Sequence, residues 1–161
     1  MVERERLHLT FEEPVTLVCA PAGSGKTALV ATEAQRGGHT TAWVTLEPTD
    51  DEPGHLWDAV LTALDLAGAV PPDSPVAALA APVRESRDSF MPLLVNALAT
   101  LPERVVLVLD DVHVLRSKEC LTQLSFLLLH APDTLRLVLT ARSDPALPLH
   151  CLLYTSPSPR D

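Results

Sequence analysis

Residues 20–27 read A-P-A-G-S-G-K-T, and they separate an apolar run, Val15–Cys19, from a segment rich in helix-forming residues. A strand, such a loop and a helix in this order are typical of a phosphate-binding loop, because glycine lets main-chain N–H groups approach a polyphosphate closely. One position departs from the usual G-x-x-x-x-G-K-[ST] pattern, since Ala20 stands at the first glycine. The alternative is a flexible Gly/Ser turn with a solvated lysine.

The loop and the first helical turn together supply the expected phosphate ligands. The start of the helix adds the positive end of its dipole to the loop amides. The Lys26 ammonium is expected to reach the β- and γ-phosphates of a nucleotide, and the Thr27 hydroxyl is a predicted ligand of Mg²⁺. The full predicted nucleotide-binding set is Ala22, Gly23, Ser24, Gly25, Lys26, Thr27 and Ala28.

Composition narrows the class of protein. A chain of 161 residues that is 47% hydrophobic is long enough for one domain with its own core. Its 12 basic and 21 acidic residues give a net charge of −9, which disfavours binding of nucleic acid or of an anionic membrane by this chain itself. No apolar run reaches the roughly 18 residues that span a bilayer, so we expect a cytoplasmic protein. The cysteines fit neither a disulfide framework nor a zinc site, and Cys19 and Cys120 are expected to be reduced core residues.

Short apolar runs alternate with helical patterns along the chain. Strands are predicted at Val15–Cys19, Thr41–Leu46, within 104–111, and at Leu135–Thr140. Helices are predicted from Lys26 to about Arg36, around Trp57–Leu64 until Gly68, over Phe90–Leu101 with Pro92 in the first turn or at a kink, and after Ser117 until Pro132. This order predicts an α/β fold with a parallel sheet, right-handed crossovers and helices on both faces.

Two carboxylates end the third predicted strand, where ligands of open α/β sheets gather. Asp110 can hold Mg²⁺ through a bound water, and Asp111 can orient or deprotonate an attacking water. The alternative for Asp111 is a solvated turn carboxylate or a helix cap. Arg142 follows the fourth strand and is predicted to contact a γ-phosphate, the alternative being a surface ion pair with Asp144. His113 is expected to pack or cap the loop behind the acids.

Four blocks together carry a family resemblance: A-P-A-G-S-G-K-T, W-V-T-L-E-P-T-D-D-E-P-G-H-L-W, V-L-V-L-D-D-V-H-V-L and L-R-L-V-L-T-A-R-S-D-P-A-L-P-L. Over residues 15–149 the chain resembles the nucleotide-binding module of the MalT-like, large ATP-binding LuxR-type transcriptional regulators, within the STAND class of P-loop ATPases. The resemblance implies a three-layer α/β/α P-loop NTPase fold of the ASCE type. It also implies that the strand before Arg142 lies between the strands that end at Cys19 and Asp110.

The resemblance assigns roles to the same residues. Lys26 and Thr27 would be the Walker A pair, Asp110 and Asp111 the Walker B acids, and Arg142 the sensor arginine. Thr27 and Asp110 would hold the metal, while Lys26, Asp111 and Arg142 would serve catalysis. The implied cofactors are ATP and Mg²⁺.

A regulatory function follows from the same resemblance. In such regulators ATP binding favours an active, self-associating form, slow hydrolysis resets it, helical repeats sense an inducer, and a C-terminal helix-turn-helix binds promoters. We therefore expect a weak ATPase that acts as a switch, with DNA contacted only through a C-terminal part absent from this sequence. One alternative is a turnover ATPase of the AAA+ or helicase-loader kind, which would normally carry glutamate at Asp111. A second alternative, a nucleotide or small-molecule kinase, would need an arginine-bearing lid, and residues 68–82 supply none.

Three segments are expected. Residues 1–14 form a lead-in without the basic, proline-containing pattern of the family, and residues 15–150 form an incomplete P-loop NTPase domain. We expect the fifth strand and the helical cap of such a module to be missing, which would leave the first strand as an apolar edge. Residues 151–161 resemble a translated sequencing adapter and are interpreted as a non-native tail, the alternative being a disordered proline-rich terminus.

Overall fold

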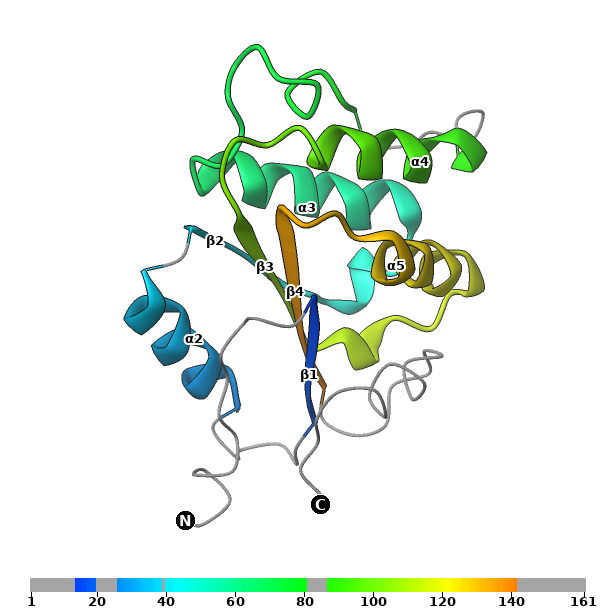
Figure 1. Cartoon of the computed structure of the whole chain (residues 1–161). Helices are drawn as coiled ribbons and strands as arrows, with labels where there is room; N and C mark the ends of the chain where they lie inside the picture. Colours follow the sequence, from blue (N-terminus) through cyan, green and yellow to red (C-terminus); the bar gives the residue numbers. More distant parts are fainter. Residues whose placement is uncertain (1–13, 20–25, 39, 81–86, 142–161) are drawn as a thin grey trace.

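A parallel four-stranded sheet with helices on both faces forms the centre of the computed structural model, which describes residues 14–19, 26–38, 40–80 and 87–141 (Figure 1). The strands are β1 (Val15–Cys19), β2 (Thr40–Thr45), β3 (Val105–Asp110) and β4 (Leu135–Ala141). They lie in the order β1-β4-β3-β2, and every neighbouring pair is parallel. This arrangement confirms the predicted α/β class. It also confirms that β4, the strand before Arg142, lies between β1 and β3, the strands that end at Cys19 and Asp110.

The helices follow the predicted pattern. They are α2 (Lys26–Gly37), α3 (Pro53–Leu66), α4 (Arg87–Leu98) and α5 (Lys118–His130), with short 3₁₀ turns η1 (Pro48–Asp50) and η3 (Val112–Val114). Gly38 and Gly68 follow α2 and α3 with φ of 67° and 77°, left-handed conformations in which glycine commonly ends a helix. Among the described residues, each helix is too short or too polar to serve as a membrane span.

The start of α4 differs from the sequence prediction. The helix begins at Arg87 rather than at Phe90, so Pro92 lies inside the helix, in its second turn and not in its first. A kink at Pro92, the other predicted possibility, stays a prediction. Residues 87–89 are polar, and an apolar stripe therefore could not mark this beginning. Leu93, which was expected in the stripe, is 54% exposed, whereas Phe90 and Leu94 are buried.

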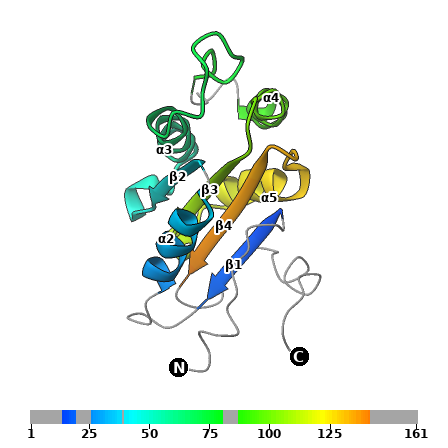
Figure 2. The same ribbon diagram turned by 60° about the vertical axis from the view of Figure 1, so that its left-hand side comes forward.

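Side chains alternate along the strands between two separate apolar clusters. On β3, Leu107 and Leu109 face the cluster that α3, α4 and α5 cover, whereas Val106 and Val108 face the one that α2 covers. Figure 2 shows α2 on one side of the sheet and α5 on the other. The structure is thus layered α/β/α, with a large core on one face and a small one on the other.

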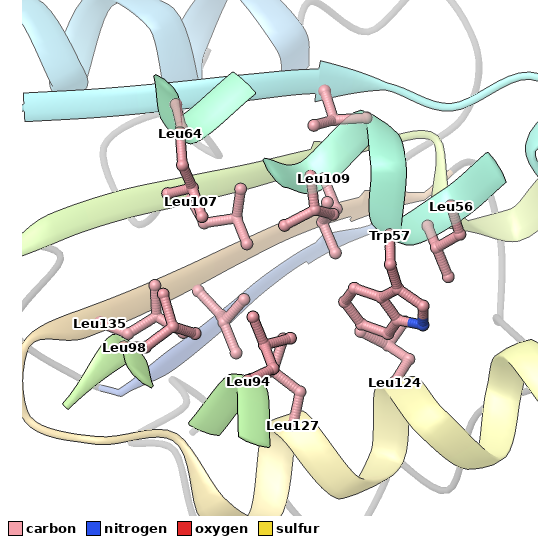
Figure 3. Packing of buried hydrophobic residues seen from close by; sticks show 14 of the residues in the cluster. Leu56, Trp57, Leu64, Leu94, Leu98, Leu107, Leu109, Leu124, Leu127 and Leu135 are labelled. Atoms are coloured by element: carbon pink, nitrogen blue, oxygen red, sulfur yellow. The ribbon is translucent and has the colours of Figure 1, made fainter. Parts of the chain in front are cut away.

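Trp57 of α3 lies at the centre of the larger core, next to Leu124 of α5 (Figure 3). The indole is fully buried, and its Nε1–H donates to the side-chain oxygen of Gln123 at 2.7 Å. This bond satisfies two buried polar groups at once and connects α3 to α5.

The loops that leave β2 and β3 are joined by one carboxylate. Asp51, just after η1, accepts hydrogen bonds from the main-chain N–H groups of Arg116 at 3.0 Å and Ser117 at 2.9 Å. The Ser117 side chain in turn accepts from the N–H of Cys120 and caps α5. Both loops are therefore fixed at the carboxyl edge of the sheet.

Candidate functional site

Two predicted site residues meet at the carboxyl edge of the sheet. The Thr27 hydroxyl, in the first turn of α2, donates to the Asp110 carboxylate at the end of β3, at 3.1 Å from Oδ1 and 3.4 Å from Oδ2. These residues are 83 positions apart in the sequence. Asp110 is only 4% exposed, and a carboxylate buried to this extent requires such donors.

The alternation of the strand explains why these residues meet. Asp110 shares its face of β3 with Val106 and Val108, which pack in the same cluster as Val30 of α2. Val30 thereby fixes α2 against this face, so that its first turn lies over the strand ends. The main-chain N–H of Leu46, which follows β2, donates to the carbonyl oxygen of Asp110 at 2.9 Å. This bond fixes the main chain of Asp110 from the neighbouring strand β2.

Thr140 of β4 is a third member of the cluster, and the sequence prediction did not include it. Its hydroxyl donates to Oδ1 of Asp110 and accepts from the N–H of Asp111 at 2.9 Å. Thr140 is completely buried. A signal was present, because Thr140 is a polar residue that directly follows the aliphatic residues 137–139 and shares a face with Val138 of the α2 cluster.

Asp111 occupies the turn that ends β3. Its φ of 68° and ψ of 47° are left-handed, a conformation that aspartate tolerates better than most residues. Its side chain makes no capping hydrogen bond to η3, so the helix-cap alternative is not supported. The residue is half-buried and directly follows the acid that contacts Thr27.

The phosphate-binding loop itself lies outside the described residues. This applies to Ala22–Gly25, to Arg142 and to the side chain of Lys26, while the main chain of Lys26 begins α2. The N–H groups of Lys26, Thr27 and Ala28 belong to the first turn, where they have no partner within the helix. That turn carries no acidic residue, so it suits an anion.

The oxygen donors of this site fit Mg²⁺. A carboxylate and a hydroxyl are hard ligands, and Mg²⁺ usually takes one or two protein oxygens and completes its shell with water and phosphate. In the parts of the chain that the structure describes, no group of three or more His, Cys, Asp and Glu side chains could hold a metal ion. Thr27 and Asp110 supply two such protein oxygens, which suits a metal that arrives with a nucleotide.

Cys120 agrees with its predicted role as a reduced core residue. Its thiol is free and buried in α5. Burial raises its pKa from the ordinary value of 9.0 to about 12, a shift that the hydrogen bond with Ser117 opposes. A thiol of this kind is a poor nucleophile.

Comparison with known proteins identifies the family. The family model described as an AAA domain matches residues 8–144. The chain is 30% identical over 142 residues to the HTH-type transcriptional regulator MalT of Serratia proteamaculans, covering 88% of this chain and 16% of that protein. It is 31% identical over 134 residues to MalT of Cronobacter sakazakii, covering 83% of this chain and 15% of that protein. The chain therefore spans only about a sixth of the length of these relatives.

Solved structures agree on the fold. Cdc6p from Pyrobaculum aerophilum matches with a TM-score of 0.55 and 20% identity, covering 97% of this chain and 41% of that one. A chain in the structure of Drosophila ORC bound to AT-rich DNA and Cdc6 matches with a TM-score of 0.51 and 14% identity, covering 91% and 45%. At these identities the likeness concerns the fold alone, an α/β P-loop fold. The chain belongs to the AAA domain family and is a MalT-like P-loop ATPase module.

Proposed function

We propose that this chain is the ATP-binding, slowly hydrolysing switch module of a LuxR-family transcriptional regulator. The observation that supports it most is the contact between Thr27 and Asp110. It brings the last residue of the phosphate-loop motif to the first of the two acids, on the face that α2 covers and at the edge where nucleotides bind in parallel α/β sheets.

Each residue has a defined task in this proposal. The amides of residues 22–28 and the Lys26 ammonium bind the phosphates, and Thr27 and Asp110 hold Mg²⁺ directly or through water. The metal, when bound, neutralises charge on the phosphates. Asp111 orients or deprotonates the attacking water, and Arg142 contacts the γ-phosphate. Because aspartate is shorter than glutamate, we expect slow turnover.

The regulatory part of the proposal rests on the relatives, which are named as HTH-type transcriptional regulators. We propose that ATP binding promotes self-association of the complete protein and that ATP hydrolysis resets it. Because this chain is acidic overall, DNA would be contacted by a helix-turn-helix outside it. A cytoplasmic location stays a prediction.

Nucleotide binding to a Lys26→Ala variant tests the binding step. We expect the wild-type chain to bind ATP in the presence of Mg²⁺ and the variant to lose at least about tenfold in affinity, since a charge-assisted contact to phosphate is removed. Lys118→Ala is a matched control, because Lys118 is an exposed lysine at the start of another helix. Equal affinity of the wild type and Lys26→Ala would contradict the proposal.

The rate of hydrolysis separates the switch from the turnover ATPase. In a single-turnover experiment on the complete protein, we expect phosphate release to be slow and to depend on an inducer. Fast release without any inducer would favour a turnover ATPase of the AAA+ kind.

A further inference from the structure

We propose that Thr140 is a positioning residue of the nucleotide site, whose buried hydroxyl fixes the Asp110 carboxylate and the Asp111 main chain together and thereby sets the affinity for Mg²⁺. This inference rests on the proposed function and adds a residue to it. It is carried by two hydrogen bonds of one hydroxyl, to Asp110 and from Asp111.

The Thr140 hydroxyl both donates and accepts a hydrogen bond. A hydroxyl has one proton to donate and lone pairs that accept. The hydroxyl donates a hydrogen bond to Oδ1 of Asp110, and its oxygen accepts one from the N–H of Asp111 at 2.9 Å. Because Thr140 is completely buried, bulk water does not compete for either bond.

These bonds make the two oxygens of Asp110 unequal. Oδ1 accepts from Thr140 and, at 3.1 Å, from Thr27, while Oδ2 receives the longer 3.4 Å contact from Thr27. Oδ2 therefore keeps more lone-pair capacity for a cation or for a water bound to it. Hydrogen-bond partners that orient a metal ligand in this way commonly affect metal affinity without touching the metal.

The second bond holds the turn that follows. Asp111 has a left-handed backbone, which is maintained only when its surroundings favour it. Its N–H is bonded to Thr140 on the neighbouring strand, so β4 fixes the direction in which the chain leaves β3. Thr140 also precedes Arg142 by two positions, and it therefore connects both predicted acids to the strand that leads to the predicted sensor arginine.

Substitution by valine and by serine separates the hydroxyl from the shape of the side chain. Thr140→Val keeps the branched shape and removes both hydrogen bonds, whereas Thr140→Ser keeps the hydroxyl. The measurement is ATP binding by the chain over a series of Mg²⁺ concentrations and without Mg²⁺. For Thr140→Val we expect a roughly 10- to 100-fold higher Mg²⁺ requirement with little change in Mg²⁺-free ATP binding. Thr140→Ser should stay close to the wild type.

Thr45→Val is a matched control for this experiment. Thr45 is on β2 and pairs in register with Asp110 of β3. Its side chain is exposed, and its hydroxyl oxygen accepts a hydrogen bond from the indole N–H of Trp43. We expect its Mg²⁺ requirement to be that of the wild type. An unchanged requirement in Thr140→Val, or an equal increase in Thr45→Val, would overturn the proposal.

Hydrogen exchange of the Asp111 amide supplies a readout that needs no nucleotide. In the wild type we expect this amide to exchange slowly for a residue in a turn, and in Thr140→Val much faster. Fast exchange in the wild type would overturn the inference even if the valine variant did not fold. If the wild type showed slow exchange but no Mg²⁺-dependent ATP binding, the proposed function would fall while the contact itself stood.

Discussion

The two faces of the sheet differ in what they bury: one carries a large apolar core, and the other a small apolar cluster beside a polar site. One face carries α3, α4 and α5 over a continuous core that includes fully buried residues such as Trp57 and Leu124. Within the described residues, the other face is covered by α2 through a small cluster around Val30 and Ala34. The polar contacts between Thr27 and Asp110 lie on this thinner side.

The difference shows how one sheet combines stability with a polar site. Burial of aliphatic and aromatic surface on the larger face supplies most of the hydrophobic free energy, which scales with the apolar area removed from water. On the smaller face, a buried carboxylate is acceptable because two hydroxyls donate to it. Substitutions on the first face should therefore change stability, and substitutions on the second should also change the site.

The largest expected loss of stability is that of Trp57→Ala on the larger face. Removing a fully buried indole leaves a cavity and leaves Gln123 without its partner, so we expect the free energy of unfolding to fall by about 4 kcal/mol. Urea denaturation measures this loss. Leu66→Ala on the same helix is the control, because Leu66 is 81% exposed and should change stability by less than about 0.5 kcal/mol. A similar loss in both variants would contradict the assignment of this core.

Val30→Ala on the smaller face should lower the free energy of unfolding less than Trp57→Ala does, and it should lower the affinity for ATP more. Two methyl groups of a fully buried side chain are removed, which lowers the free energy of unfolding by about 2 kcal/mol. Because Val30 lies one turn after Thr27 in α2, the variant should also bind ATP with Mg²⁺ more weakly. Denaturation and nucleotide titration of the same samples test both effects. Leu124→Ala, on the opposite face, should lower stability and leave the affinity of the folded protein unchanged; equal losses of affinity would break the distinction between the faces.

Alkaline pH should weaken the larger face gradually through Cys120. Burial raises the pKa of this thiol from 9.0 to about 12, so above pH 9 the unfolded chain loses a proton that the folded chain keeps. The stabilisation is complete below pH 9 and falls by about 1.4 kcal/mol per pH unit as the pH rises toward 12. The difference in stability between the wild type and Cys120→Ala, measured from pH 8 to 10, isolates this effect. A difference that stays constant over this range would show that the thiol titrates normally.

Much of this architecture could be predicted from the sequence. The run from Val105 to Asp110 is buried on both faces, and such a strand reads as continuous aliphatics until a polar residue ends it. Gly68 marked the end of a predicted helix, because a left-handed backbone conformation favours glycine. The strand order could not follow from spacing, and only the family resemblance implied it.

The missed features depend on contacts between distant segments. Thr140 acquires its place only when β4 is set beside β3, and Asp51 bonds to main-chain groups 65 and 66 positions away. Val76 lies in the proline-rich connection and is nevertheless 3% exposed, because it packs against the larger core. Local patterns carry no information about such contacts.

The stability of the chain against urea, with and without ATP and Mg²⁺, tests the central claim most directly. A ligand that binds only the folded state at a hundred times its Kd raises the free energy of unfolding by about 2.7 kcal/mol. We expect an increase of this size with ATP and Mg²⁺ together, a smaller one with ATP alone, and the loss of the Mg²⁺-dependent part in Asp110→Asn. An unfolding transition of the wild-type chain that does not move with millimolar ATP and Mg²⁺ would contradict a nucleotide site between Thr27 and Asp110.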